Sequence, residues 1–297
     1  GNSIIHYAAQ WGLDTIIPQV IAQGGSTEIK NATGETALFS AVKADKTNSI
    51  QALLDAGANL YARDTQGNTA LHAAIRWNTE NAARTLIQSG PIIHERNLQG
   101  KTALHEAVRL GMSSIESLLV QSGAKLELRD IEGNTPLMEA VHGGNSSSVE
   151  RLCDYGANPE ARNIRGNTPL HSAVLTGRTD IANLLLHRGA SIHARNADGQ
   201  TPFDLALISS EEMVGTLLTK DRLLTSDDDG NTALHIAIMK NAESVFVQRI
   251  ISQGVAVSAS DAKGYTPLHL AIQTQRWDIV RSLVEAGSDI FARALNG

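Results

Sequence analysis

A nine-residue phrase, of which GNTPLHSAV at Gly166–Val174 is one copy, recurs along the chain at a nearly constant spacing. The glycine that opens each copy forms a column: Gly1, Gly34, Gly67, Gly100, Gly133, Gly166, Gly199, Gly230, Gly264 and Gly297. The first six intervals are 33 residues, and the last three are 31, 34 and 33. A second column keeps this step: Gly24, Gly57, Gly90, Gly123, Gly156, Gly189, Gly254 and Gly287. Two columns in register predict a repeat architecture with one supersecondary unit per period.

The first half of residues 166–198 has the pattern of a short amphipathic helix. Thr168 is a favourable N-cap, and Pro169 is tolerated at the first helical position. Leu170, Ala173 and Val174 then lie on one helical face.

A second helix is predicted between Gly177 and Gly189, because glycine adopts the left-handed conformation that ends a helix at little cost. Thr179 or Asp180 is expected to cap it. A turn-rich hairpin then leads into the next copy. Such a helix pair cannot bury its apolar side alone, so neighbouring copies must stack.

The period of 33 residues and the motif Thr-Pro/Ala-Leu-His-x-Ala resemble the ankyrin repeat, and the likeness covers the whole chain as nine repeats. The resemblance implies an all-α fold, an ankyrin-repeat α-solenoid in which each repeat is a helix-turn-helix followed by a β-hairpin or loop. We expect a single array over residues 1–297. Its repeats are 1–33, 34–66, 67–99, 100–132, 133–165, 166–198, an irregular 199–229, 230–263 and 264–297.

Small residues dominate the predicted core. Apolar residues make up 42% of the chain but aromatic residues only 4%, so the core must consist mainly of Ala, Leu, Ile and Val. An alanine in the first helix of every repeat is expected to let adjacent helices approach closely. These alanines are Ala8, Ala41, Ala74, Ala107, Ala140, Ala173, Ala206, Ala237 and Ala271.

The seventh repeat departs from the pattern. Asp204 stands in place of the motif histidine, and Arg222 stands where the helix-ending glycine is expected. We interpret this segment as a distorted repeat that bends the solenoid, in preference to an acidic cation or partner site at residues 227–229, whose spacing does not match a calcium loop. Phe39 and Met138 replace the motif histidine in two other repeats.

The remaining motif histidines step by one repeat: His6, His72, His105, His171, His235 and His269. We prefer a structural role over a metal or catalytic ladder. The ankyrin resemblance implies that each ring ties the hairpin to the start of the helix. Because the positive end of a helix dipole disfavours the imidazolium form, these histidines are expected to be neutral.

No enzyme motif is present, so no catalytic residue, cofactor or metal is predicted. Cys153 is the only cysteine, which excludes an internal disulfide, and its position in the second helix predicts a buried small apolar side chain. There is no apolar run long enough to insert into a membrane and no signal-peptide pattern, so a cytoplasmic location is favoured. Neither end carries a polar capping repeat, which favours a segment of a longer protein.

A basic column lies four residues before the phrase glycines: Lys30, Arg63, Arg96, Arg129, Arg162, Arg195 and Arg293. One interpretation is a hairpin residue that is solvated or paired with nearby acids. The other follows from the resemblance, because hairpin tips and inner helices of ankyrin proteins form a concave binding groove. The column would then place cations along one edge of this groove.

A second set of residues points to the same groove. Arg and Trp are enriched in binding hot spots, and several fall on the inner surface of the first four repeats. We predict that partner-binding residues are Tyr7, Trp11, Lys43, Arg63, Arg76, Trp77, Arg96, Arg109, Arg129 and Arg162.

The leading functional hypothesis is a non-catalytic, monomeric protein–protein interaction module, a scaffold or adaptor, whose concave groove takes an extended, acidic protein segment with apolar anchors. The alternative is a regulatory or targeting domain of a larger enzyme, channel or effector. A plain spacer is disfavoured by the patterned groove. Nucleic-acid binding is disfavoured by the net charge of −6 and the few aromatic residues.

Overall fold

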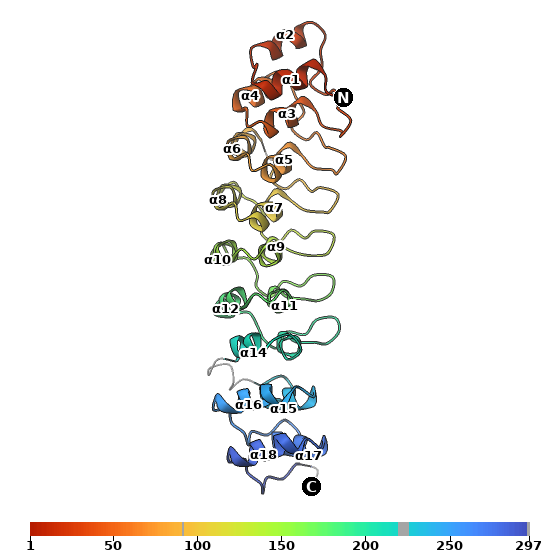
Figure 1. The fold of residues 1–297 in the computed structure, drawn as a ribbon. Coiled ribbons are helices and arrows are strands. Elements are labelled where there is room, and N and C mark those ends of the chain that lie inside the picture. The colour runs from red at the N-terminus through yellow and green to blue at the C-terminus, as the bar shows by residue number, and fades with distance from the viewer. Residues whose placement is uncertain (91, 219–225, 296–297) are drawn as a thin grey trace. The chain divides into compact units, whose positions relative to one another are not determined.

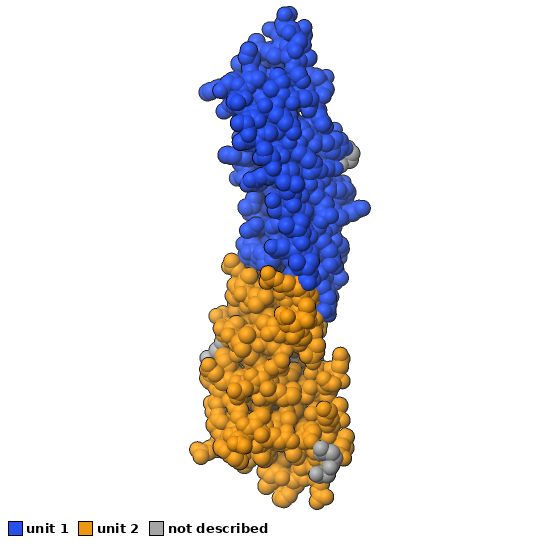
Figure 2. Space-filling model, turned by 90° about the vertical axis from the view of Figure 1, so that its right-hand side faces the viewer, with its two compact units in different colours: residues 1–164 blue, residues 165–297 orange. Residues whose placement is uncertain are grey.

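The computed structural model describes residues 1–90, 92–218 and 226–295, and over these ranges it is all-helical, without a strand. It divides into two compact units, Gly1–Ile164 and Arg165–Gly297 (Figure 2). The all-α fold class is therefore confirmed, whereas the single array over residues 1–297 stays a prediction. None of the described helices is long and apolar enough to cross a bilayer.

The first unit consists of five helix pairs, each followed by a loop that projects on the side of the odd-numbered helices (Figure 1). The helices are α1 (Ile4–Trp11), α2 (Ile16–Ala22), α3 (Ala37–Lys43), α4 (Thr47–Asp55), α5 (Ala70–Arg76), α6 (Glu80–Ser89), α7 (Ala103–Leu110), α8 (Ser113–Gln121), α9 (Pro136–Gly143) and α10 (Ser146–Asp154).

The second unit contains four pairs. Its helices are α11 (Pro169–Leu175), α12 (Thr179–His187), α13 (Pro202–Ala206), α14 (Glu211–Leu217), α15 (Ala233–Met239), α16 (Ser244–Ser252), α17 (Pro267–Gln273) and α18 (Trp277–Glu285).

Within the first unit the pairs stack in chain order. Helices α1, α3, α5, α7 and α9 contact one another in succession, and so do α2, α4, α6, α8 and α10. The alanine column forms the close contact between them, since all nine alanines are at most 3% exposed. Stacking buries the apolar side that a single pair would leave in water, which is the main stabilising term of such a fold.

The first helix of a repeat begins as predicted, and the second does not. Thr168 is the N-cap of α11 and accepts a hydrogen bond from the backbone N–H of His171. Gly177 and Gly189 have the left-handed φ values of 68° and 88°. The predicted cap of α12 is wrong: the helix begins at Thr179 itself, because the backbone N–H of Arg178 bonds to Ala173 and closes the turn.

The hairpins are loops stabilised by an Asp or Asn side chain, without regular strand pairing. In the second repeat, Oδ1 of Asp64 accepts the backbone N–H groups of Gln66 and Asn68, both at 2.8 Å. Each loop in the first unit also bonds to its neighbour: the N–H of Leu98 donates to the carbonyl of Gln66 at 3.0 Å. These bonds hold the loop tips one repeat apart and so fix one wall of any groove.

The seventh repeat differs from the regular ones at its first helix, and a bend of the array at this place stays a prediction. Its first helix, α13, has only five residues, and Asp204 caps it by accepting the backbone N–H of Thr201 at 2.9 Å. Asp227 serves the ordinary hairpin function, accepting the N–H groups of Asp229 and Asn231. The prediction for Arg222 lies outside the described residues. In the described part of the chain, no group of three or more His, Cys, Asp or Glu side chains could hold a metal ion.

Burial differs between the residues that replace the motif histidine and the single cysteine. Phe39 and Met138, which replace the motif histidine, are fully buried and fill its place with apolar volume. Cys153 is only half-buried, so the prediction of a buried residue is wrong. Its neighbour Leu152 is a buried residue of α10.

Candidate protein-binding surface

The histidine ladder is structural where the described contacts define it. Nδ1 of His72 lies 3.3 Å from the backbone nitrogen of Thr69, and Nε2 lies 2.9 Å from the carbonyl oxygen of Lys101 in the next repeat. Because a carbonyl only accepts, Nε2 carries the proton and Nδ1 accepts. Burial lowers the pKa of His72 to about 4, and it also lowers the pKa of His105 and His235. The rings are therefore neutral ties between repeats.

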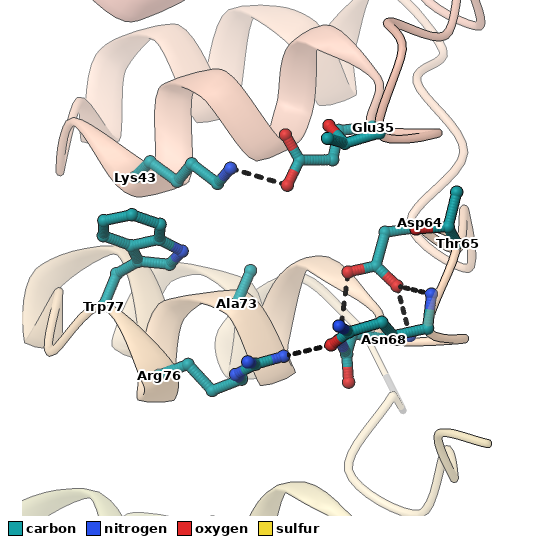
Figure 3. A pocket seen from close by; sticks show the side chains of 10 residues that line it. Glu35, Lys43, Asp64, Thr65, Asn68, Ala73, Arg76 and Trp77 are labelled. Atoms are coloured by element: carbon teal, nitrogen blue, oxygen red, sulfur yellow. Dashed lines mark hydrogen bonds and ion pairs between the residues drawn. The ribbon is translucent and has the colours of Figure 1, made fainter.

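Trp77 is the centre of the candidate surface (Figure 3). It is the C-cap residue of α5, and 60% of its surface is exposed. The ammonium of Lys43, at the end of α3, lies 5.1 Å from the ring centroid, which is within the range of a cation–π contact. The same ammonium forms an ion pair with Glu35 at 2.6 Å. These contacts order the indole while leaving most of it accessible.

Arg76 precedes Trp77 and points to the hairpin side of the surface. Its Nη1 donates to Oε1 of Gln66 at the loop tip, at 2.7 Å. This bond joins the end of α5 to the hairpin, so the helix and the loop form two walls of the space between them. A neutral amide leaves the charge of the guanidinium uncompensated.

Three consecutive hollows follow this line between hairpins and odd-numbered helices. The first, of about 440 Å³, includes Lys43 and Trp77, the second, of about 330 Å³, adds Arg76, and the third, of about 540 Å³, contains Arg76 and Arg109. Neighbouring hollows share lining residues, so they form a continuous groove, which we call the 43–110 groove. Its third hollow also has Leu98 and Leu110 on its rim, 67% and 56% exposed.

The structure brings together only part of the predicted site. Lys43, Arg76, Trp77 and Arg109 line the groove. Trp11, which is 71% exposed, lines a separate hollow of about 230 Å³ with the loop and helix start at residues 45–49. Tyr7 is 52% exposed on α1 and lines none of these four hollows.

The basic hairpin column makes contacts that build the fold. Arg63 donates through Nη1 to the carbonyl of Gly67 at 2.8 Å and to that of Arg96, and it forms an ion pair with Glu95 at 2.5 Å. Arg96 reaches the carbonyl of Gly100 at 2.9 Å. Each side chain thus fastens its own loop or the next one.

Two further members of the column follow the same rule. Arg129 donates to the carbonyl of Arg162 at 2.6 Å, and Lys30 donates to that of Arg63 at 2.9 Å. Arg162 itself is exposed on its loop. These hydrogen bonds give Lys30, Arg63, Arg96 and Arg129 a structural role, and contact of the column with a partner stays a prediction.

Glu106 is a groove residue that the sequence reading missed. It lies on α7 one turn before Arg109, and burial raises its pKa to about 7, although Arg76, Lys101 and Arg109 act in the opposite direction. Oε1 accepts from the amide of Asn97 at 3.2 Å, whereas Oε2 is buried without a partner in the described structure. The available signal was an acidic residue between two columns of basic residues. The same arrangement also occurs at many solvated positions, so the sequence alone does not single out Glu106.

Glu139 occupies the equivalent place in the next repeat and behaves in the opposite way. Burial alone would raise its pKa, but hydrogen bonds from His142 and Lys101 outweigh it and lower the pKa to about 2. The ion pair with Lys101 spans 2.6 Å. Lys101 is held by Glu139, and Glu106 forms no ion pair with any residue that the structure describes.

The stacked helix pairs, the hairpin ladder and the groove beside it define the class of helical repeat proteins. A model of the ankyrin repeats matches residues 5–97, 104–196 and 205–294, which is most of the chain. The chain belongs to the ankyrin repeat family.

Two solved structures share the fold. The ankyrin repeat domain of Bcl-3, described as a member of the IkappaB protein family, aligns with a TM-score of 0.67 and 30% identity, covering 73% of this chain and 98% of that one. The human ASB11 ankyrin repeat domain aligns with a TM-score of 0.62 and 25% identity, covering 73% and 97%.

Curated relatives match shorter stretches. The rice BTB/POZ domain and ankyrin repeat-containing protein NPR3 is 33% identical over 86 residues, 29% of this chain and 14% of that protein. The mouse RelA-associated inhibitor is 39% identical over 70 residues, 24% and 8%. The Drosophila tyrosine-protein kinase Shark is 30% identical over 70 residues, 24% and 7%. The chain therefore spans at most about a seventh of these relatives.

Proposed function

We propose that this chain is a non-catalytic protein-interaction module that binds an extended, acidic protein segment with apolar anchors in the 43–110 groove. The observation that carries the proposal is the run of three hollows, of which the first two share Lys43 and Trp77 and the last two share Arg76. An extended segment fits a continuous groove, and a half-exposed, ordered tryptophan is typical of an interface hot spot.

The chemistry of the groove favours an acidic partner. Lys43 is paired with Glu35, but Arg76 bonds to a neutral amide, and Arg109 makes no ion pair within the described residues. Two uncompensated guanidinium groups along one groove attract carboxylates and fix their position by bidentate hydrogen bonds. Leu98 and Leu110 offer apolar contacts at the same place.

The names of two relatives support an interaction role. The mouse protein is named as an inhibitor associated with RelA, and Bcl-3 is described as a member of the IkappaB protein family. The partner of this chain is a separate matter, because fold does not determine partner.

A binding selection tests the proposal. A phage-displayed library of random 16-residue peptides is selected on the chain, and the best synthetic peptide is titrated against a double variant, Trp77→Ala with Arg76→Glu. We expect peptides rich in Asp, Glu and Leu, and a loss of affinity of at least roughly tenfold in the variant, because an interface anchor and a charge contact are removed together.

The second unit supplies a matched control. Trp277 is 64% exposed and Arg281 is also exposed, both on α18, so Trp277→Ala with Arg281→Glu makes the same chemical change far along the chain. This control should bind the peptide like the parent protein. Equal affinity in both double variants, with both folded by circular dichroism, would refute the groove as the binding site.

A second candidate function is a regulatory or targeting domain within a larger protein. Its support is the small share of each curated relative that this chain matches. Sequencing of the full-length transcript decides it, because the candidate requires a further domain in the same reading frame.

A further inference from the structure

We propose that the third hollow of the 43–110 groove seats an acidic side chain of the bound segment and that Glu106 takes up a proton as it does so. This inference rests on the proposed function and adds the chemistry of one subsite. It predicts that binding of an acidic segment is proton-coupled near neutral pH.

The geometry places three cations and one carboxyl group around the hollow. Arg76 comes from α5, Lys101 from the segment that leads into α7, and Arg109 from α7, and all three line the hollow with Glu106. Glu106 and Arg109 are three residues apart on one helix, so their side chains lie on the same face. An incoming carboxylate at this place therefore meets two guanidinium groups and a carboxyl group.

Glu106 is poorly solvated in its ionised form. One oxygen accepts a single hydrogen bond from Asn97, at 3.2 Å, and the other is buried without any partner in the part of the chain that the structure describes. An ionised carboxylate needs several donors when water is excluded, so this arrangement favours the protonated acid. The raised pKa of Glu106, about 7, agrees with this geometry.

A second carboxylate in the hollow strengthens that preference. Like charges held close together raise the pKa of one of the two groups, and the pair titrates as a unit. The bound segment therefore raises the pKa of Glu106 above its value in the free protein, and a proton is taken up on binding. Protonation in turn leaves Arg76 and Arg109 facing the ligand carboxylate without an opposing charge from α7.

The remaining charged groups near Glu106 are on α9. Glu139 raises the pKa of Glu106, but it is paired with Lys101 at 2.6 Å and stays ionised, since its own pKa is lowered to about 2. His142 lies 3.6 Å from Glu139 and carries a charge only when it is protonated. A His142→Gln variant therefore belongs in the test.

The sign of the linkage is fixed by the proton uptake. Below pH 7 Glu106 is already protonated in the free protein and affinity is high. As pH rises from about 7 through the higher pKa of the complex, affinity falls. If the two pKa values differ by one unit, the total change is roughly tenfold.

The experiment uses two labelled peptides as probes, four copies of Leu-Glu-Ser and four copies of Leu-Gln-Ser. Glutamates of the peptide stay ionised between pH 6.5 and 8.5, so they contribute no slope. For the parent chain we expect the Glu peptide to bind roughly three- to tenfold more tightly at pH 6.5 than at pH 8.5. Calorimetry in Tris and in HEPES should also show net proton uptake near pH 7.5.

Four outcomes decide the proposal. Glu106→Gln should bind the Glu peptide tightly at both pH values, whereas His142→Gln and Glu150→Gln, an exposed acid on α10, should keep the parent slope. An unchanged slope in Glu106→Gln, or no slope in the parent, would overturn the proton uptake and leave the proposed function intact. Equal binding of the Gln peptide would overturn the acidic subsite. No binding of either peptide up to millimolar concentration would overturn both.

Discussion

The fourth repeat, residues 100–132, and the seventh, residues 199–229, solve the same problem with different side chains. In the fourth, Nδ1 of His105 accepts the N–H of Thr102 at 3.1 Å, and Nε2 donates to the carbonyl of Asn134 in the next repeat at 3.2 Å. One neutral ring therefore caps its own helix and ties two repeats together in a buried place.

The seventh repeat achieves only the first of these functions. Asp204 caps α13, but its Oδ1 is buried without a partner in the described structure, and its link to the next repeat is an ion pair with Lys240 at 3.6 Å. Lys240 is half exposed, so water and salt weaken this pair. Helix α13 has five residues where α7 has eight. Helix capping and coupling between repeats are thus separable, and of these two side chains only the histidine provides both through hydrogen bonds.

The largest expected effect comes from placing an aspartate at the histidine position of the fourth repeat, as the seventh repeat has it. His105→Asp should keep the helix cap and lose the bond to Asn134. The residue at the position of Lys240 is Gly143, which supplies no cation, so the new carboxylate is buried and unpaired. We expect a loss of about 3 kcal/mol in the free energy of unfolding. Urea denaturation monitored by circular dichroism measures it.

An exposed histidine serves as the control for that substitution. His187→Asp, at the end of α12, should change the stability by less than about 1 kcal/mol. A His105→Asp protein as stable as the parent at pH 7.5 would show that the tie between repeats carries little energy.

The comparison also shows how far sequence alone reaches. The period of the sequence predicts the number of repeats and the position of the alanine column. Alanine is needed there because close contact between helices permits only a small side chain at Ala140 or Ala206. It also identifies the irregular seventh repeat. Sequence could not assign the second bond of each histidine ring, because that bond joins residues 29 or 30 positions apart and depends on the stacking distance.

The candidate site was less accessible to sequence reasoning. Lys43, Arg76 and Trp77 were predicted on one inner surface, and they line one groove. Trp11 has the same position in its repeat as Trp77, yet it faces a different hollow, because Asp45 and Lys46 occupy its neighbourhood. Solvation decides the state of Glu106, and no one-dimensional pattern reports solvation.

Substitutions in the alanine column test whether the regular and the irregular repeats share the same close packing between helices. Ala140 in α9 and Ala206 in α13 are both fully buried. Leu at either position overpacks the helix contact, and we expect each substitution to lower the free energy of unfolding by about 1–3 kcal/mol. Ala197→Leu is the control, since Ala197 is exposed on a hairpin and Leu98 stands at the equivalent position.

The measurement is urea denaturation of the three variants, with hydrogen exchange to report each repeat separately, because long arrays can unfold in parts. A loss at Ala140 without one at Ala206 would mean that the seventh repeat is not packed against its neighbours as tightly as the regular ones.

Glu106 gives the fourth repeat a pH-dependent weakness. The folded protein keeps its proton up to about pH 7, whereas the ordinary value is 4.5, so the free energy of unfolding falls as pH rises between these values. Gln keeps the bond from Asn97 and carries no charge. We therefore expect Glu106→Gln to raise stability by about 1–2 kcal/mol at pH 8 and to change it little at pH 5.

Urea denaturation of Glu106→Gln at both pH values checks this, with Glu150→Gln as the control for removing a charge. A gain of the same size at pH 5 and pH 8 would assign the effect to packing and would remove the electrostatic argument.

The reverse exchange, Asp204→His, has the smallest expected effect. The carbonyl of Asn231 already accepts the N–H of Asp227 at 3.0 Å. In the same way the carbonyl of Lys101 accepts the N–H of Asn97, and it also accepts a hydrogen bond from Nε2 of His72. A histidine at 204 can use the second lone pair of Asn231 and removes the unpartnered oxygen, whereas only a half-exposed ion pair is lost. We expect a gain of about 1 kcal/mol at pH 7.5.

The gain should disappear below about pH 6, because a proton on the new Nδ1 would face the N–H of Thr201 and could no longer accept its hydrogen bond. Urea denaturation at pH 7.5 and pH 5.5 therefore separates two explanations. A gain present at both pH values would arise from removing a buried carboxylate alone. A loss at pH 7.5 would mean that the short helix α13 holds the repeat at a distance that the ring cannot span. The short helix, and not the aspartate, would then be the cause of the irregularity of the seventh repeat.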